Sequence, residues 1–323
     1  MVDSSRPARP VVLGQNQYGK AENRVVKITR DGDTHHIKDL NVSVALSGDL
    51  DDVHYNGSNA NCLPTDTTKN TCFAFAKEHG IESAESYGIH LARHFVESQP
   101  SIHRARIRIE EYSWERIAAS DSNSQFIGAD EVKHSFVRTG QETRLAQITY
   151  SAEGDGEATF EVLGGLKDLT VMNTTNSEFW GYIKDKYTTL KEDYDRILAT
   201  SLSTWWRYTW TGDDQRTPSW NKSYEQAKKH ILQAFVETYS LSLQQTLYQM
   251  GSRVLNNRSE IDEIRFSAPN KHHFRQDLSF CGLDNDAKDG AVYYAADRPY
   301  GLIEATILRD GAEAKIPVDM TNL

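Results

Sequence analysis

Cysteine is scarce in this chain. Its 323 residues include only three cysteines, Cys62, Cys72 and Cys281. Three scattered thiols are too few for a disulfide framework or for a thiolate metal site. The count therefore excludes the class of small disulfide-rich secreted domains and favours a reducing, cytosolic setting.

Long apolar runs and positive charge are also lacking. No stretch approaches the ~18 consecutive apolar residues of a membrane-spanning helix, and the polar residues Met1–Pro10 contain no apolar signal-peptide core. We interpret residues 1–11 as a flexible tail. The net charge of −10 is opposite to that of proteins that neutralise phosphates. We therefore expect no nucleic-acid partner and no membrane partner.

The remaining composition is that of a globular protein. Hydrophobic residues make up 38% and charged residues 25%, which allows a packed core and excludes wholesale disorder. The length suits two domains of ordinary size.

The first half of the chain shows strand patterns on either side of a helix. Ser83 can cap a helix in which Tyr87, Leu91 and Phe95 share one face. Apolar and polar residues alternate, as in half-buried strands, in four segments: Arg24–Thr29, Leu40–Leu46, Ala105–Tyr112 and Arg144–Tyr150. Gly154-Asp155-Gly156 predicts a turn after the last of them.

The second half repeats this order. Ala158–Leu163 and Leu169–Thr174 predict two strands separated by Gly164-Gly165, and Tyr224 to about Asn256 predicts a helical region broken around Ser240. Strand character returns at Ile261–Phe266 and Gly301–Leu308. The pattern predicts an α+β chain of two tandem domains, 12–155 and 156–309, followed by a C-terminal tail, 310–323.

One segment carries a family resemblance. The residues concerned are Leu169–Val171, Asn176–Tyr182 (NSEFWGY), Tyr187–Leu190 and Arg196. Together they resemble the signature segment of uricases, particularly actinobacterial-like members. Asn173 departs from the lysine usual in that family, at a position beside the motif. Four further blocks match in the right order: Tyr18-Gly19-Lys20; Thr65-Asp66 with Lys69-Asn70-Thr71; His134-Ser135-Phe136 with Arg138; and Pro269-Asn270-Lys271-His272. The resemblance extends from about residue 12 to about residue 309.

The resemblance implies a fold and a reaction. In uricases each half is a tunnelling-fold (T-fold) domain, an antiparallel four-stranded sheet with helices on one face. Two such domains per chain assemble into a homotetramer that forms a tunnel, with active sites at the subunit interfaces. The implied reaction converts urate, O2 and water into 5-hydroxyisourate and hydrogen peroxide with no cofactor, whether metal or flavin.

The resemblance also implies a urate-binding set. Phe179 would provide an aromatic face, Arg196 a fork of donors and Gln244 a donor–acceptor edge for the purine. Leu190 and Leu243 would form apolar walls, and the backbone N–H of Asp66 would donate to the ligand. Without the motif, Phe179 is typical of core packing, Arg196 of an ion pair with Asp193 or Asp195, and Gln244 of a solvated helix residue.

By the same resemblance, the catalytic proton relay would consist of Lys20, Thr65 and His272. Asn270, together with Thr65, would hold oxygen or water above the purine. On residue type alone, Lys20 is typical of a loop lysine and Thr65, after Pro64, of a helix N-cap. The pair His272-His273 also suggests a metal site, but adjacent side chains on a strand point apart and no matching ligand cluster accompanies them.

Two alternatives remain from other classes. One is a different T-fold enzyme acting on a purine or pterin, such as a cyclohydrolase or pterin synthase, and the other is a purine-binding protein without catalysis. The C-terminal Thr321-Asn322-Leu323 differs from the Ser-Lys-Leu type of peroxisomal signal, so we expect a cytoplasmic protein.

Overall fold

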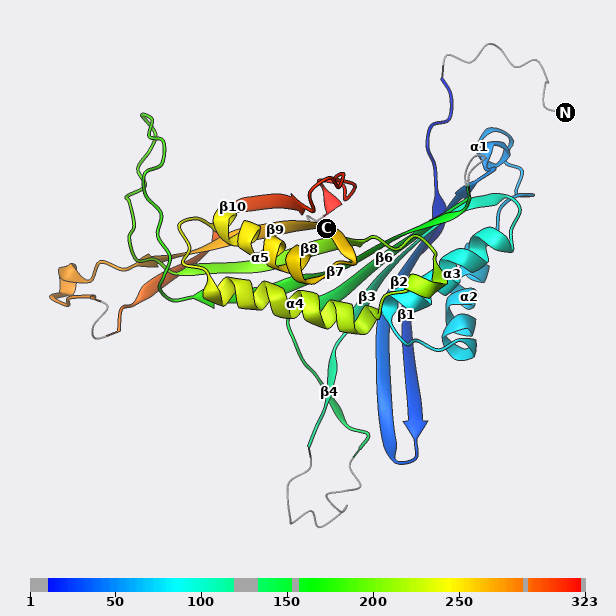
Figure 1. The fold of residues 1–323 in the computed structure, drawn as a ribbon, viewed down its shortest axis with the longest axis horizontal. Helices are drawn as coiled ribbons and strands as arrows, with labels where there is room; N and C mark the ends of the chain where they lie inside the picture. Colours follow the sequence, from blue (N-terminus) through cyan, green and yellow to red (C-terminus); the bar gives the residue numbers. More distant parts are fainter. Residues whose placement is uncertain (1–10, 119–132, 153–156, 287–289, 321–323) are drawn as a thin grey trace. The chain divides into compact units, whose positions relative to one another are not determined.

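The computed structural model describes residues 11–118, 133–152, 157–286 and 290–320 (Figure 1). The chain divides into two compact units, one made of the residues up to Glu110 with Gln147–Glu161, the other of Glu111–Ala146 with the residues from Val162 onward. Antiparallel strands and helices make each an α+β structure. The predicted tail up to residue 10, the turn at Gly154-Asp155-Gly156 and the C-terminal tripeptide lie outside the described residues.

The first unit contains a sheet and three helices. The strands follow the order β1-β2-β3-β6, and β1 pairs with β2 in antiparallel register. The strands are β1 (Tyr18–Asp31), β2 (Thr34–Gly48), β3 (Ile102–Tyr112) and β6 (Thr143–Ser151), and the helices are α1 (Asp51–Asn56), α2 (Thr65–Glu78) and α3 (Ala84–Glu97). All four predicted strands are confirmed. The capped helix is confirmed too, because the Ser83 side chain accepts a bond from Ser86 N at 3.0 Å.

The core of the first unit lies where α3 packs on the sheet. Tyr87, Leu91 and Phe95 on one face of α3 are at most 1% exposed. A Cβ added to Gly88 would lie 2.5 Å from Ile148 Cδ1, so a larger residue there would force the Ile148 side chain to shift.

The second unit contains further strands and two long helices. Its strands follow the order β7-β8-β9-β10, with antiparallel pairing of β7 with β8, β8 with β9, and β9 with β10. Helices α4 and α5 lie side by side across one face of these strands (Figure 1). The main elements are β7 (Thr159–Asn173), β8 (Leu198–Tyr208), α4 (Trp220–Glu237), α5 (Leu243–Asn257), β9 (Ile261–Arg275) and β10 (Tyr293–Leu308). Short 3-10 helices lie at Asp214–Arg216 and Ser279–Cys281. A separate two-stranded ribbon consists of β4 (Trp114–Arg116) and β5 (Phe136–Arg138). The predicted break near Ser240 is confirmed, since it separates α4 from α5.

The prediction of two strands separated by Gly164-Gly165 is wrong. Both glycines lie inside the single strand β7, where a Cβ on Gly164 would be 2.5 Å from Trp206 Nε1 and one on Gly165 would be 2.5 Å from Thr204 O. The glycines therefore serve close packing against β8 and not a turn. The partner strand β8 went unpredicted.

The segment that follows β10 packs into the core of the second unit. Ile316 and Met320 are 4% exposed and share a core cluster with Leu145, Leu163 and Trp205. The buried Glu263 carboxylate accepts bonds from the backbone N–H groups of Lys315 and Ile316 at 2.9–3.0 Å. No helix in the described ranges is long and apolar enough to cross a membrane.

Candidate active site

The second unit contains a pocket of about 700 Å³. It is built from the segment before β8, the start of α5, and strands β9 and β10. It brings together seven of the predicted site residues: Phe179, Leu190, Arg196, Leu243, Gln244, Asn270 and His272. The other three, Lys20, Thr65 and Asp66, lie in the first unit.

A small backbone ladder holds Phe179 next to Arg196. Phe179 N donates to Asp193 O at 2.7 Å and Asp193 N donates to Phe179 O at 3.0 Å. Arg196 N donates to Ser177 O at 2.8 Å. Two side chains 17 positions apart in sequence are thereby fixed side by side.

The Arg196 guanidinium is oriented within the pocket wall. Its carbon Cζ lies 5.2 Å from the centroid of the Phe179 ring, and its Nε donates to Ser177 Oγ at 3.0 Å. Burial lowers the pKa of Arg196, and the nearby Asp193 carboxylate opposes this; the group stays charged at neutral pH. Within the described chain it forms no ion pair with Asp193 or Asp195, and its two terminal nitrogens make no hydrogen bond. The fork therefore remains available for a ligand.

Ser240, in the connection between α4 and α5, ties this segment to the second helix. Glu178 N donates to Ser240 O at 2.8 Å, and Ser240 N donates to Asn176 O at 2.9 Å. Because α5 begins three residues later, the break between the helices brings Gln244 to the same pocket as Phe179.

The two glutamines at the start of α5 have different tasks. Ser242 caps the helix by accepting a bond from Gln245 N at 3.1 Å, and Gln245 Oε1 accepts from Leu241 N at 2.8 Å. Gln244 is exposed and lines the pocket, while Leu243 is buried in its wall. The free N–H groups of this first turn add a positive potential that favours an anionic ligand.

Strand β9 contributes Asn270 and His272, two residues apart on one face. Burial lowers the pKa of His272, and the positive charges of Arg196 and of a protonated His273 lower it further. The imidazole is consequently neutral near pH 7 and able to accept a proton.

In the first unit, Lys20, Thr65 and Asp66 gather at the start of α2. The Asp66 carboxylate lies 2.5 Å from Lys69 Nζ. The pKa of Asp66 is lowered mainly by Lys69, with a smaller contribution from the charge of Lys20. Tyr18 Oη accepts a bond from Leu63 N at 2.8 Å, which fixes the start of β1 beside the loop that leads into α2.

Thr65 is not the N-cap of α2. That position belongs to Pro64, and Thr65 is the first helical residue. Its hydroxyl is half-buried and makes no hydrogen bond within the described chain. The N-cap interpretation is therefore wrong, because the chain enters the helix one residue earlier.

Two neighbours of the predicted residues were missed from sequence. Ile303 of β10 adds an apolar wall to the pocket. Tyr182, which is not among the lining residues, stacks on Phe179 with ring centroids 5.1 Å apart and planes 11° apart. The alternation in Gly301–Leu308 could have placed Ile303 on one face of its strand, but no pattern indicates that this face meets the pocket.

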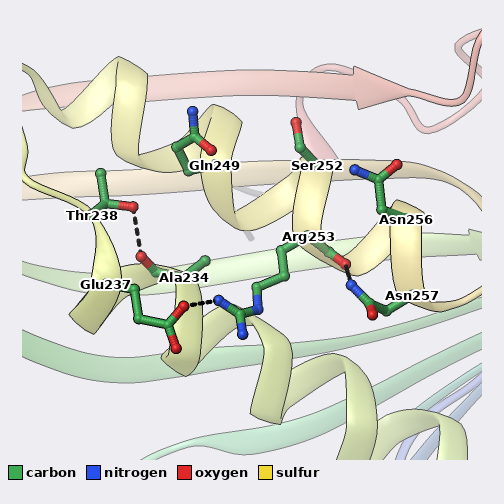
Figure 2. A pocket seen from close by; sticks show the side chains of 8 residues that line it. All are labelled: Ala234, Glu237, Thr238, Gln249, Ser252, Arg253, Asn256 and Asn257. Carbon is green, nitrogen blue, oxygen red and sulfur yellow. Dashed lines mark hydrogen bonds and ion pairs between the residues drawn. The ribbon is translucent and has the colours of Figure 1, made fainter.

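A second hollow, of about 440 Å³, lies between α4 and α5 (Figure 2). Its Arg253 pairs with Glu237, its Thr238 Oγ1 donates to Ala234 O at 2.6 Å and its Asn257 Nδ2 donates to Arg253 O at 2.8 Å. Its lining has no aromatic side chain, so it offers no face for a planar ligand. Across the described ranges, no three His, Cys, Asp or Glu side chains are grouped so as to hold a metal ion.

Comparison with known proteins shows the family of this chain. The uricase family model matches residues 16–149 and 162–304. The chain belongs to the uricase family. It is 45% identical to the uricase of Arthrobacter globiformis over 308 residues, covering 95% of this chain and 93% of that protein. It is 34% identical to the uricase of Emericella nidulans over 300 residues, covering 91% and 96%. The crystal structure of the Arthrobacter globiformis uricase superposes with a TM-score of 0.84 at 43% identity, covering 96% of this chain and 99% of that one.

Family membership confirms the α+β uricase fold predicted from the signature blocks. The second matched range begins at Val162, the residue at which the chain enters the second unit for the last time.

Proposed function

We propose that this chain oxidises urate with O2 and water to 5-hydroxyisourate and hydrogen peroxide, without a cofactor. Membership of the uricase family makes it a urate oxidase, an oxidoreductase that uses O2. The observation that carries the proposal is the single pocket that unites Phe179, Arg196 and Gln244.

The pocket matches the chemistry of urate, a flat and electron-rich anion. The Phe179 ring gives a stacking surface, and the unpaired Arg196 fork suits two acceptor atoms of a purine. Gln244 offers one donor and one acceptor to the remaining edge. The start of α5 adds a positive potential behind Leu243 and Gln244.

A neighbouring chain completes the site in this proposal. The tandem domains 12–155 and 156–309 are T-folds, and four chains form a homotetramer around a tunnel. Lys20, Thr65 and the Asp66 N–H of one chain then meet the pocket of the next. The grouping of these three residues at the start of α2, in the first unit and outside the pocket lining, supports a shared site.

Lys20, Thr65 and His272 act as a proton relay. A hydroxyl beside an amine and a neutral imidazole can pass a proton in either direction, and the lowered pKa of His272 keeps it in the accepting form. Loss of a proton from urate leaves a dianion that gives one electron directly to O2, which explains how oxidation proceeds without a flavin or metal.

The oxidation transfers two electrons from urate to O2. The urate radical and superoxide combine at a purine carbon, where Thr65 and Asn270 hold the oxygen, and a proton returned by the relay gives a hydroperoxide. The C–O bond then breaks, and the hydroperoxide anion leaves with the electron pair of that bond and takes up a proton to form hydrogen peroxide. Water adds to the oxidised purine, and the relay takes up its proton, which yields 5-hydroxyisourate.

The test is a urate assay with the purified protein. The ultraviolet absorbance of urate should decay at an unchanged rate after exhaustive chelation, with one hydrogen peroxide formed per urate and no visible flavin band. Stoichiometric zinc, copper or iron, with activity lost on its removal and regained on its return, would contradict the cofactor-free proposal.

A further inference from the structure

The sheet position beside Asn270 contains a buried hydroxyl without a partner. Thr200 of β8 is the register partner of Asn270 in β9. Thr200 is fully buried, and its Oγ1 makes no hydrogen bond within the described chain. Buried polar atoms nearly always have a partner, because an unpaired one destabilises the fold. This hydroxyl therefore needs an explanation.

Thr204 shows what a threonine on this strand face otherwise does. It lies four residues after Thr200, on the same face and equally buried, and its Oγ1 donates to Arg265 O at 2.9 Å. The two threonines share strand, face and burial. They differ in that Thr200 stands opposite a residue of the urate pocket.

As direct register partners on neighbouring strands, Thr200 and Asn270 have adjacent side chains on one face of the sheet. Direct register partners in an antiparallel sheet have Cβ atoms about 4.5–5.5 Å apart. The Asn270 carboxamide also makes no hydrogen bond within the described chain. On its other side, Asn270 pairs with Gly301, where the position of a Cβ has no heavy atom within 4 Å. On that side, therefore, the cross-strand partner offers no side chain that could hold Asn270.

We infer that Thr200 is a positioning residue that fixes the orientation of Asn270 when the pocket is filled. Its hydroxyl donates to Asn270 Oδ1, which leaves Nδ2 directed at the oxygen or water above the purine. Without this bond the carboxamide can flip by 180° and present the wrong atom, since its two ends differ only in donor and acceptor character. The inference rests on the proposed role of Asn270.

The experiment compares Thr200→Val, Thr200→Ser and Thr204→Val. Thr200→Val keeps the shape and removes the hydroxyl, so kcat should fall by about 10-fold or more while the Kd of 8-azaxanthine stays within about twofold. Its Tm should hold or rise, because an unpaired buried hydroxyl has gone. Thr200→Ser should restore most of kcat. Thr204→Val, the matched control, should lower Tm through its lost bond and leave kcat unchanged.

Asn270→Ala, measured in parallel, separates the positioning role of Thr200 from the oxygen-binding role of Asn270. Full kcat in Thr200→Val together with a large loss in Asn270→Ala would overturn the inference and leave the proposed site intact. Full kcat in Asn270→Ala would remove the proposed role of Asn270 and this inference with it. Equal losses of kcat in Thr200→Val and Thr204→Val, or no recovery in Thr200→Ser, would reduce Thr200 to a packing residue.

Discussion

The Arg196 guanidinium carbon lies 5.2 Å from the centroid of the Phe179 ring, and the guanidinium is held there by the Nε bond to Ser177 Oγ at 3.0 Å. This arrangement uses one edge of the fork for positioning and leaves the outer nitrogens for the ligand. It also sets the charged fork next to the aromatic stacking surface.

The first prediction concerns this fork. Arg196→Lys keeps the charge and removes the planar pair of donors, so one ligand oxygen should lose its partner. A lost charge-assisted bond corresponds to about 1–3 kcal/mol, and KM for urate should rise by about 10-fold or more with a smaller change in kcat. Steady-state kinetics and 8-azaxanthine titration measure both. Wild-type KM in Arg196→Lys would show that a point charge suffices.

The second prediction concerns the proton relay. Lys20→Met and Thr65→Ala should each lower kcat by roughly 10²-fold, the scale of general acid–base help, with little change in KM. Thr65→Ser should retain most of the rate, and Thr67→Ala, two residues along the same helix and exposed, serves as a matched control. A kcat within about twofold of wild type for Lys20→Met would exclude the relay.

The third prediction concerns pH. The pKa of His272 is below its ordinary value of 6.5 through burial, Arg196 and His273. Since neutral His272 is the active form, kcat/KM should hold at pH 6.5 and decline only at lower pH. His273→Gln removes a charge that lowers this pKa, so the acid limb should move to higher pH. A pH–rate profile of both proteins tests the shift, and an unmoved or downward-moved limb would assign the limb to another group.

The fourth prediction separates two neighbouring glutamines. Gln244→Leu should raise KM for urate by about 10-fold, because the ligand edge loses its donor and its acceptor, while stability should change little, since Gln244 is exposed. Gln245→Leu should lower Tm, since Leu241 N loses its acceptor, and should leave KM near the wild-type value. The opposite assignment of effects would mean that Gln245 is the residue that contacts urate.

The sequence predicted elements better than it predicted connections. Strand alternation and the Ser83 cap are local signals, and those elements are confirmed. The predicted break at the glycine pair in β7 is wrong because Gly164 and Gly165 make room for Trp206 and for the backbone of Thr204, both distant in the chain. A local pattern cannot show that kind of tertiary requirement.

The pocket was predictable only through the family motif. Residue type alone favours core packing for Phe179 and solvation for Gln244. Phe179 and Gln244 line the same pocket because Phe179 pairs with Asp193 and because Ser240, between α4 and α5, pairs with the segment next to Phe179. Neither pairing has a local sequence signal. Thr200 lies in β8, a strand that the sequence patterns did not predict. Its proposed positioning role follows from its register with Asn270.

In the proposed enzyme two chains share each active site, and co-expression of two inactive variants tests this sharing. Lys20→Met damages only the first-unit half and Arg196→Ala only the pocket half. In randomly mixed tetramers each half is intact with probability about one half, so roughly a quarter of the sites should be wholly wild type and activity should recover to about that level. Each variant alone must first be shown to be nearly inactive, and hybrids must be confirmed by mass spectrometry. Confirmed hybrids no more active than either parent would contradict the shared site.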